Sequence, residues 1–279
     1  SLEDTCDDVQ AVAARILNHL LGQKQQATET DILDIQPIVR PLWKTIQNVR
    51  LISPCIKDVV VLLSTILEQQ NCTLVLEEIS NRSRDTIWDS FRNVLERLRV
   101  LLTCESLSVK VCVMQSTGII VGQIVDASEK ATNATIEDSS RNSMNGCYCR
   151  MIQQVFNLYR HMSLIGSDQD TTSIAENKKL EVASSNLWSL LVDASGVILR
   201  EDSEHRQQVQ KYLVLQYFGL QDMDKKAWSA GKDYMACYNA FRGQRLQMQV
   251  KLARVIAGFY HSTSSMMVQR NDKSQNLDV

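Results

Sequence analysis

Apolar residues recur at helical spacing through the second half of the chain. From Met144 to Ile165 they follow alternating steps of four and three residues, and the stretch from Leu180 to Val197 does the same. This spacing places one apolar seam along a helix, as in helical bundles. A longer segment with the same rhythm runs from about Asp222 to His261. A shorter repeat over Val209, Leu213 and Leu220 precedes it. We therefore expect four helices here, the last about 60 Å long at 1.5 Å per residue.

The first half carries a similar pattern less regularly. Short apolar repeats predict helices near residues 38–52 and 88–102, and Ser53-Pro54 is typical of a helix start. Pro41 predicts a kink or a late start in the 38–52 helix. The first helix is marked by four apolar residues and closed by a glycine: Val9, Val12, Ile16, Leu20 and Gly22.

One stretch fits two kinds of secondary structure. The alternation over Val109–Met114 is typical of a strand, but the apolar positions that continue to Ile124 fit a helix. We favour a helix, because an isolated strand would have nothing to pair with. Gly118 and Gly122 lie four residues apart in this stretch, and their spacing predicts that a neighbouring element packs closely against them.

The distribution of proline supports the same fold class. Pro37, Pro41 and Pro54 are the three prolines of the chain, so residues 55–279 contain none. Such a run favours long helices over a turn-rich β-sandwich, because proline inside a helix costs about 3 kcal/mol. We predict an all-α protein whose long amphipathic helices pack as one or two antiparallel helical bundles. A helical repeat array is the structural alternative, although no fixed period of about 30 to 45 residues is present.

A polar stretch over residues 132–143 is the best candidate for a domain boundary. It predicts an N-terminal helical subdomain over residues 1–135 and a subdomain resembling a four-helix bundle over residues 136–263. The apolar pattern ends after Ser262, so residues 264–279 are expected to form a disordered tail.

Composition places the chain among globular proteins, with 279 residues of which 44% are hydrophobic and 22% charged. The net charge of −2 is unevenly distributed. Residues 225–279 carry nine Lys or Arg against three Asp, a net of +6, and the preceding residues carry 21 basic and 29 acidic side chains, a net of −8. A basic segment on an acidic body is expected to dock against that body or against an acidic partner.

The sequence offers no convincing catalytic, cofactor or metal site. Cys147 and Cys149 would point about 200° apart on a helix, so they cannot hold one ion together. The residues around Gly231 lack the first glycine and the hydroxyl residue of a phosphate-binding loop. The eight cysteines lie mostly in apolar helical stretches, where free cysteine behaves as a small hydrophobe. Without a recognisable signal peptide or transmembrane run, the expected location is the cytoplasm.

The basic C-terminal segment is the one feature that indicates a binding surface. Its candidate residues are Arg242, Arg245, Lys251 and Arg254. Two interpretations stay open: these are solvated side chains on a bundle helix, or they form a docking surface for an acidic protein, an anionic membrane or an actin-like filament. Nucleic acid is disfavoured, since the positive charge is modest and no aromatic residues on the same face would stack on bases.

These observations favour a non-enzymatic scaffold or adaptor that binds other proteins, acidic or helical ones above all. One alternative is a bundle that binds anionic membranes through its basic C-terminal helix, and another is an all-α enzyme with a site assembled from distant side chains. Long helices with small-residue contacts and short polar loops resemble, at the level of fold, the bundles of vinculin and α-catenin. The resemblance implies a bundle and a cytoskeletal setting, and it assigns no residue.

Overall fold

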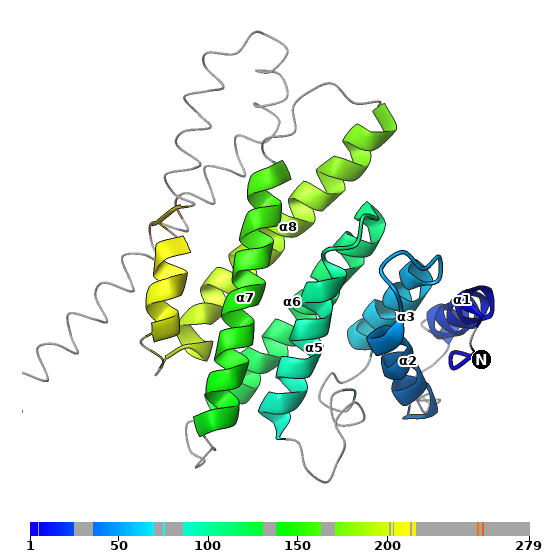
Figure 1. Ribbon diagram of the computed structural model, residues 1–279, viewed down its shortest axis with the longest axis horizontal. Coiled ribbons are helices and arrows are strands. Elements are labelled where there is room, and N and C mark those ends of the chain that lie inside the picture. The colour runs from blue at the N-terminus through cyan, green and yellow to red at the C-terminus, as the bar shows by residue number, and fades with distance from the viewer. Residues whose placement is uncertain are drawn as a thin grey trace, which may run out of the picture.

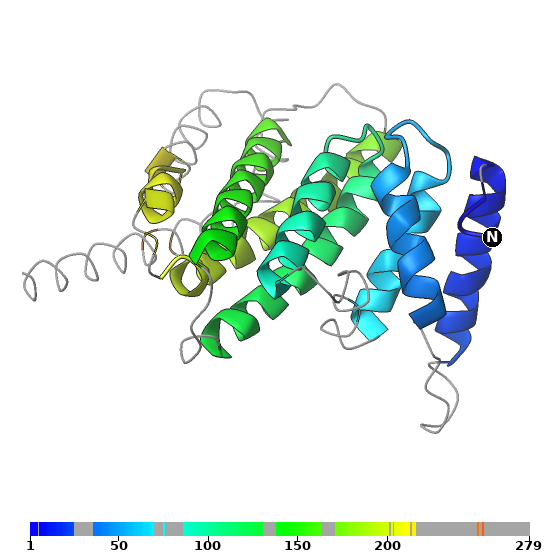
Figure 2. The same cartoon turned by 60° about the horizontal axis from the view of Figure 1, so that its bottom comes forward.

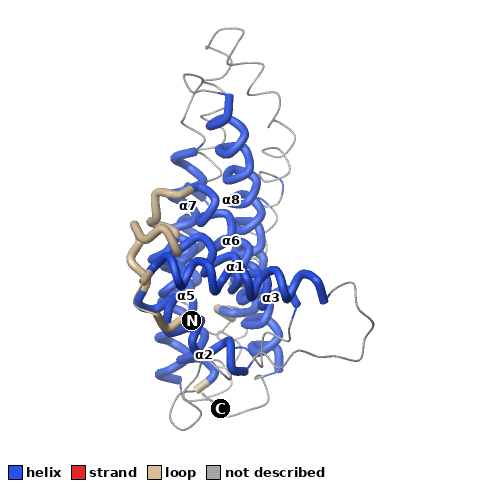
Figure 3. The backbone as a smooth tube through the Cα atoms, turned by 90° about the vertical axis from the view of Figure 1, so that its right-hand side faces the viewer, coloured by secondary structure: helices blue, strands red, loops and turns tan. Residues whose placement is uncertain are grey.

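The computed structural model describes residues 1–4, 6–24, 36–69, 75, 86–130, 138–162, 171–200, 202, 204–212, 214–215, 250 and 253. Its helices are α1 (Asp7–Lys24), α2 (Gln36–Asn48), α3 (Ile56–Gln69), α5 (Ile87–Leu101), α6 (Leu107–Lys130), α7 (Asp138–Met162) and α8 (Thr171–Ile198). Residues 204–212 are also helical. The described residues contain helices and no strand (Figure 3), so the predicted all-α class is confirmed.

The helices are packed as a bundle that is extended at one end. In the bundle α5 packs against α6 and α7, and α8 packs against α6 and α7. Helix α3 continues this packing by lying on α6, and α1 and α2 in turn lie on α3. Figures 1 and 2 show the result as a row of helices that runs from α1 at one end to residues 204–212 at the other. The predicted packing of amphipathic helices as a bundle is therefore confirmed.

The directions of α6 and α8 show how the helices are stacked. Two antiparallel pairs, α5 with α6 and α7 with α8, lie side by side. Val111 and Lys179 lie at one end of the surface these two helices share, and Asp126 and Asp193 lie at the other, so α6 and α8 run in the same direction. Helical repeat proteins stack their pairs in this way. The helices α5 and α7 begin about 50 residues apart, beyond the periods considered from sequence, which is why the pattern did not indicate the stacking.

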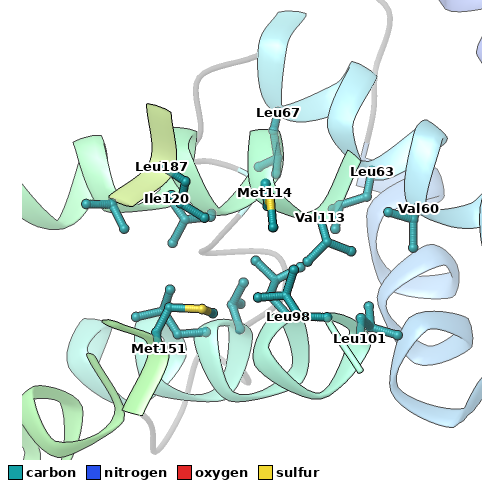
Figure 4. Close-up of a cluster of buried hydrophobic side chains, with 14 of the residues drawn as sticks. Val60, Leu63, Leu67, Leu98, Leu101, Val113, Met114, Ile120, Met151 and Leu187 are labelled. Atoms are coloured by element: carbon teal, nitrogen blue, oxygen red, sulfur yellow. The ribbon is translucent and has the colours of Figure 1, made fainter. Parts of the chain in front are cut away.

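One hydrophobic core joins the described helices. Figure 4 shows its centre, where side chains of five helices meet: Val60, Leu63 and Leu67 of α3, Leu98 and Leu101 of α5, Val113, Met114 and Ile120 of α6, Met151 of α7 and Leu187 of α8. Burying each such side chain stabilises the fold by about 1.5–3 kcal/mol. The division at residue 135 stays a prediction, but the described helices on its two sides share this core.

The predicted seam of α7 faces the core. Met144, Tyr148, Met151 and Val155 are all fully buried. The Tyr148 hydroxyl also donates a hydrogen bond to the backbone carbonyl of Leu191 on α8, at 2.5 Å. Helix is likewise confirmed for Val109–Met114, which lies within α6.

The predicted seam of α8 is only partly correct. Leu180, Leu187 and Ala194 are buried, but Leu190 is 37% exposed. The buried side of this helix also includes Trp188, which the seam did not contain. Because α8 packs against both α6 and α7, its buried face is wider than one seam.

Helix α1 is confirmed, but it continues past Gly22 to Lys24, and its apolar seam faces outward. Val9, Val12, Ile16 and Leu20 are 39%, 50%, 55% and 49% exposed. The side that packs on α3 is formed by smaller residues, Ala11 and Ala14, together with Leu21. Small side chains let the α1 backbone lie close to α3, and the larger apolar residues are left on the opposite side.

Helix α2 begins at Gln36 and contains both Pro37 and Pro41. Of the two expectations for this helix, the late start is therefore wrong, and the kink stays a prediction. Its C-terminal end is held by a side chain of α5. The Arg97 guanidinium donates to the backbone carbonyls of Ile46 and Val49, each at 2.7 Å. These two bonds satisfy carbonyls that the end of a helix leaves without a partner. Burial of Arg97 lowers the pKa of its guanidinium.

Helix α5 begins with a capping box. The Asp89 backbone N–H donates to the Thr86 side-chain oxygen at 3.2 Å, and the Thr86 backbone N–H donates to an Asp89 carboxylate oxygen at 3.3 Å. Ser140 of α7 donates to the same carboxylate oxygen at 3.3 Å, which ties the starts of the two helices together. The hydrogen bond from the Thr86 side chain is the main cause that lowers the pKa of Asp89.

We expect Asp89→Asn to lower the free energy of unfolding at pH 7 by about 1 kcal/mol, the usual loss when a helix cap is weakened. Because the pKa of Asp89 is lowered on folding, its carboxylate stabilises the protein above its ordinary pKa. This stabilisation is lost as the pH falls through the folded pKa. The difference between variant and parent should therefore shrink in acid. Urea denaturation across that pH range measures it.

Asp126→Asn, at an exposed position of α6, is the matched control and should change stability by less than about 0.5 kcal/mol. An Asp89→Asn variant whose deficit stays constant from pH 7 into acid would contradict the role given to the carboxylate.

Candidate functional site

An open apolar groove lies between α6 and α8 and is called the α6–α8 groove here. It consists of two adjoining hollows of about 1070 and 480 Å³, and Asn186 and Leu190 line both, so the groove is continuous. Its apolar lining comes from Val111, Gly118, Ile119, Gly122 and Val125 of α6 and from Val182, Ala183, Leu190 and Val197 of α8.

The groove follows from a second stripe on each helix, beside the one that faces the core. On α6 the lining positions 111, 115, 118, 122 and 125 advance in steps of four and three, and positions 179, 183, 186 and 190 of α8 do the same. The small residues of these stripes, Gly118, Gly122 and Ala183, leave a valley between the two helices. At 1.5 Å per residue, the lining spans about 22 Å of α6 and about 27 Å of α8.

The two glycines of α6 open the groove further. A Cβ built on Gly118 or Gly122 would have no described atom within 4 Å. The close neighbour predicted from their spacing is thus not found among the described residues. Glycine within a helix costs about 0.8–1 kcal/mol relative to alanine. These two positions therefore weaken α6 while leaving room for something to lie against its backbone.

Charges are unevenly placed along the groove. Glu68 and Lys179 line the end where α6 begins, so opposite charges are present there. Asp126 and Asp193 line the other end, from the two facing helices, and both are exposed. Since α6 and α8 run in the same direction, both helices also end near these two carboxylates. The partial negative charge of a helix C-terminus adds to theirs, and the positive charge of Lys130 in the last turn of α6 opposes it.

A second apolar surface lies on α1. It is the exposed stripe Val9, Val12, Ile16 and Leu20 described above. Contiguous apolar surfaces of this kind mark interaction sites more often than isolated exposed residues do.

The polar clusters of the described residues have structural roles. Asp202 accepts hydrogen bonds from the His205 backbone N–H at 2.9 Å and from Asn145 at 3.2 Å, and its other contact is His205 Nδ1 at 2.6 Å. The nearby Cys149 thiol donates to the His205 carbonyl at 3.8 Å. Burial raises the pKa of Cys149 to about 12, so this group is a neutral thiol at pH 7 and a poor nucleophile.

Cys147 and Cys149 point toward different elements, as their spacing on a helix predicted. The Cys147 thiol contacts the carbonyl of Arg92 and the carboxylate of Glu96 on α5, whereas Cys149 contacts the segment around His205. Burial raises the pKa of Cys147 to about 12 as well. Among the described residues, no three His, Cys, Asp or Glu side chains are grouped so as to hold a metal ion.

A polar hollow of about 500 Å³ lies beside the start of α1 and the end of α2. Several of its polar side chains are bonded to one another or to nearby residues. Lys44 pairs with Glu3 at 3.0 Å, and the Asp7 carboxylate accepts a hydrogen bond from Ser53 at 2.6 Å. The hollow therefore brings together compensated charges and no activated nucleophile.

The binding residues predicted from sequence lie outside the described residues. This applies to Arg242, Arg245, Lys251 and Arg254, and to the tail over 264–279. The helix expected from Asp222 to His261 also lies outside them, apart from positions 250 and 253. The groove was not predicted, although two glycines four residues apart in a strongly apolar helix were the signal that would have indicated it.

Helix α6 is the one described helix that is long and apolar enough, by length and composition, to cross a membrane. Core helices of globular proteins meet the same criterion. In this structure α6 packs against α3, α5 and α8, and nine of its residues are buried.

Together, fold and site define an all-α protein of stacked helical pairs with an apolar groove between two parallel helices. No protein family, no curated protein and no solved structure matches the chain. The function is therefore argued from the geometry of the described residues.

We expect Gly118→Ala and Gly122→Ala each to raise the free energy of unfolding by up to about 1 kcal/mol. Alanine is the better helix former, and its methyl group meets no described atom within 4 Å. Thermal and urea denaturation of the full chain measure the change. Gly196→Ala in α8, which also has open space around it, is the matched control and should stabilise similarly. A loss of stability at position 118 or 122 would show that the space is filled.

Proposed function

We propose that the chain is a protein-binding scaffold that holds an α-helix of a partner in the α6–α8 groove. The observation that carries this proposal is a continuous, exposed, apolar groove with two glycines in its wall. An amphipathic helix laid into an apolar groove is a common mode of protein recognition.

The dimensions support a helix as the occupant. A third helix packs between two neighbours when its side-chain ridges enter the valley between them. The lining positions advance in steps of three and four residues on both walls, which matches the spacing of such ridges. A groove about 22–27 Å long takes about 15–18 helical residues.

The remaining surface supports binding over catalysis. The exposed stripe on α1 offers a second apolar contact. The buried thiols Cys147 and Cys149 have raised pKa values, and the Asp202–His205 pair stabilises the start of the helix over residues 204–212. The proposal keeps the scaffold function expected from the sequence but moves the binding surface from the basic C-terminal residues to the groove. The cytoskeletal setting, the cytoplasmic location and the membrane-binding alternative stay predictions.

Site-specific photo-crosslinking tests the proposal. A photoreactive residue at the exposed groove position Gln115 should crosslink a partner protein in extract of the source cells. Gly122→Leu should reduce the crosslinked product about tenfold or more. A bulky side chain in a closely packed interface costs about 1–3 kcal/mol, and about 1.4 kcal/mol corresponds to tenfold. Leucine is a good helix former, so the variant should fold.

Two controls accompany this measurement. Gly196→Leu changes a helical glycine that does not line the groove, and it should leave the product unchanged. A photoreactive residue at Glu105, which is exposed and outside the groove, should not capture the same protein. Equal capture from positions 105 and 115, or capture that survives Gly122→Leu, would refute the groove as the binding site.

A further inference from the structure

Helix α1 lies at the end of the row of described helices (Figure 2), and its outer side is apolar. The large side chains exposed there, called the α1 stripe here, are Val9, Val12, Ile16 and Leu20. In proteins built from stacked helices, the terminal units keep a polar outer face, because an apolar one lowers solubility. The α1 stripe therefore indicates a surface that another protein covers.

The fold holds the α1 stripe away from the groove of its own chain. α1 packs on α3 through a side that includes the buried Ala11, Ala14 and Leu21. Arg15 of α1 also forms an ion pair with Asp58 of α3, at 3.1 Å. Because these contacts fix the rotation of α1, its stripe reaches an α6–α8 groove only when that groove belongs to a second copy.

We infer that the helix held in the α6–α8 groove is α1 of a second copy of this chain. This inference rests on the proposed function and names the partner at the same site. The contact joins two different surfaces, so each copy offers one stripe and one groove. A contact of this kind is heterologous, and it produces rings or open chains of copies.

The dimensions of α1 fit those of the groove. α1 has 18 residues, or about 27 Å at 1.5 Å per residue, and the groove lining spans about 22–27 Å. The stripe residues advance in steps of three and four, as the lining positions of both walls do. The stripe carries large side chains, whereas the walls hold small residues at Gly118, Gly122 and Ala183. The two surfaces are thus complementary in length, spacing and size of side chain.

The charges near the groove do not select against this occupant. Glu68 and Lys179 offset each other at one end, and Lys130 lies one helical turn after Asp126 at the other. The stripe itself is uncharged. The contact therefore depends on apolar burial, and its affinity should change little between low salt and about 0.3 M salt.

The size of the contact predicts a weak association. A helix about 10 Å wide and about 27 Å long buries about 400 Å² on each partner when half of its surface is covered. Standard interfaces bury about 800 Å² on each partner, and their dissociation constants range from micromolar to picomolar. For about half that area we expect micromolar or weaker binding, which is visible at a protein concentration of about 100 µM.

Sedimentation velocity and photo-crosslinking of the purified full chain test this inference. At that concentration the average mass should exceed the mass of one chain and fall toward it on dilution. A photoreactive residue at Gln115 should crosslink to residues 7–24. In a mixture of isotope-labelled and unlabelled chains, crosslinks between a labelled and an unlabelled peptide show that two copies are involved.

The double variant Val12→Gln/Ile16→Gln changes the centre of the stripe at two exposed positions. It should weaken association about tenfold or more, because two apolar side chains no longer contribute their burial. The matched control Ile52→Gln/Ile87→Gln removes two exposed apolar side chains outside both surfaces and should leave association unchanged. Equal thermal unfolding of the two variants shows that the effect is not one of folding.

A mixing experiment distinguishes this contact from a pairing of two stripes. Val12→Gln/Ile16→Gln keeps its groove and Gly122→Leu keeps its stripe, so each variant alone should be largely monomeric. Their equimolar mixture should form a heterodimer with about the affinity of the parent chain. It should not grow further, because the remaining stripe and the remaining groove are both altered.

The other outcomes overturn the inference. If Val12→Gln/Ile16→Gln dissociates the chain and Gly122→Leu does not, the stripes pair with each other. A purified chain that is monomeric at the stated concentration, or a crosslink from position 115 that lies outside residues 7–24, also refutes α1 as the occupant. Capture of a different protein at position 115 from cell extract then leaves the proposed function standing, whereas capture of no protein removes both.

Discussion

The fold depends on the burial of α6 against three neighbours at once. This helix contacts α3, α5 and α8, and it carries no charged residue between Lys110 and Asp126. A helix that is apolar on most sides is stable in a folded chain only when other helices cover it. The packing of α3 on one side and α8 on another follows from this need, and these contacts join the two ends of the row of helices.

Covering α6 with parallel and antiparallel neighbours leaves one strip of it open. α5 is joined to α6 by a short connection and lies antiparallel to it, whereas α8 arrives from the next pair and runs in the same direction. Cylinders that touch along a line leave valleys on both sides, and side chains decide whether a valley is filled. Along this one, Gly118, Gly122 and Ala183 fill very little of the space. The groove is thus a consequence of small residues at particular positions on a regular scaffold.

Much of the secondary structure could be predicted from the sequence, because a helix in contact with the core repeats its apolar residues every three to four positions. The seam of α7, with Met144 and Tyr148 buried, illustrates this. The pattern does not say which of two apolar stripes turns inward. On α1 the pair Ala11 and Ala14 is buried while Ile16 is exposed, because small residues permit close approach to α3. Such a choice depends on the shape of the neighbour, which a local pattern does not contain.

The same reasoning explains why the candidate site was sought elsewhere. Basic residues are conspicuous in a sequence, whereas a groove arises from residues that are separated by more than 50 positions and become neighbours only through the stacking of two pairs. Gly118 and Gly122 are the feature of the local sequence that reflects this groove. Each lowers the stability of α6 without any described neighbour that requires a glycine there. A helix whose only role was to fill the core would be more stable with alanine at both positions. The proposed helix-binding role gives the open backbone a purpose, because a helix laid in the groove can approach most closely where side chains are absent.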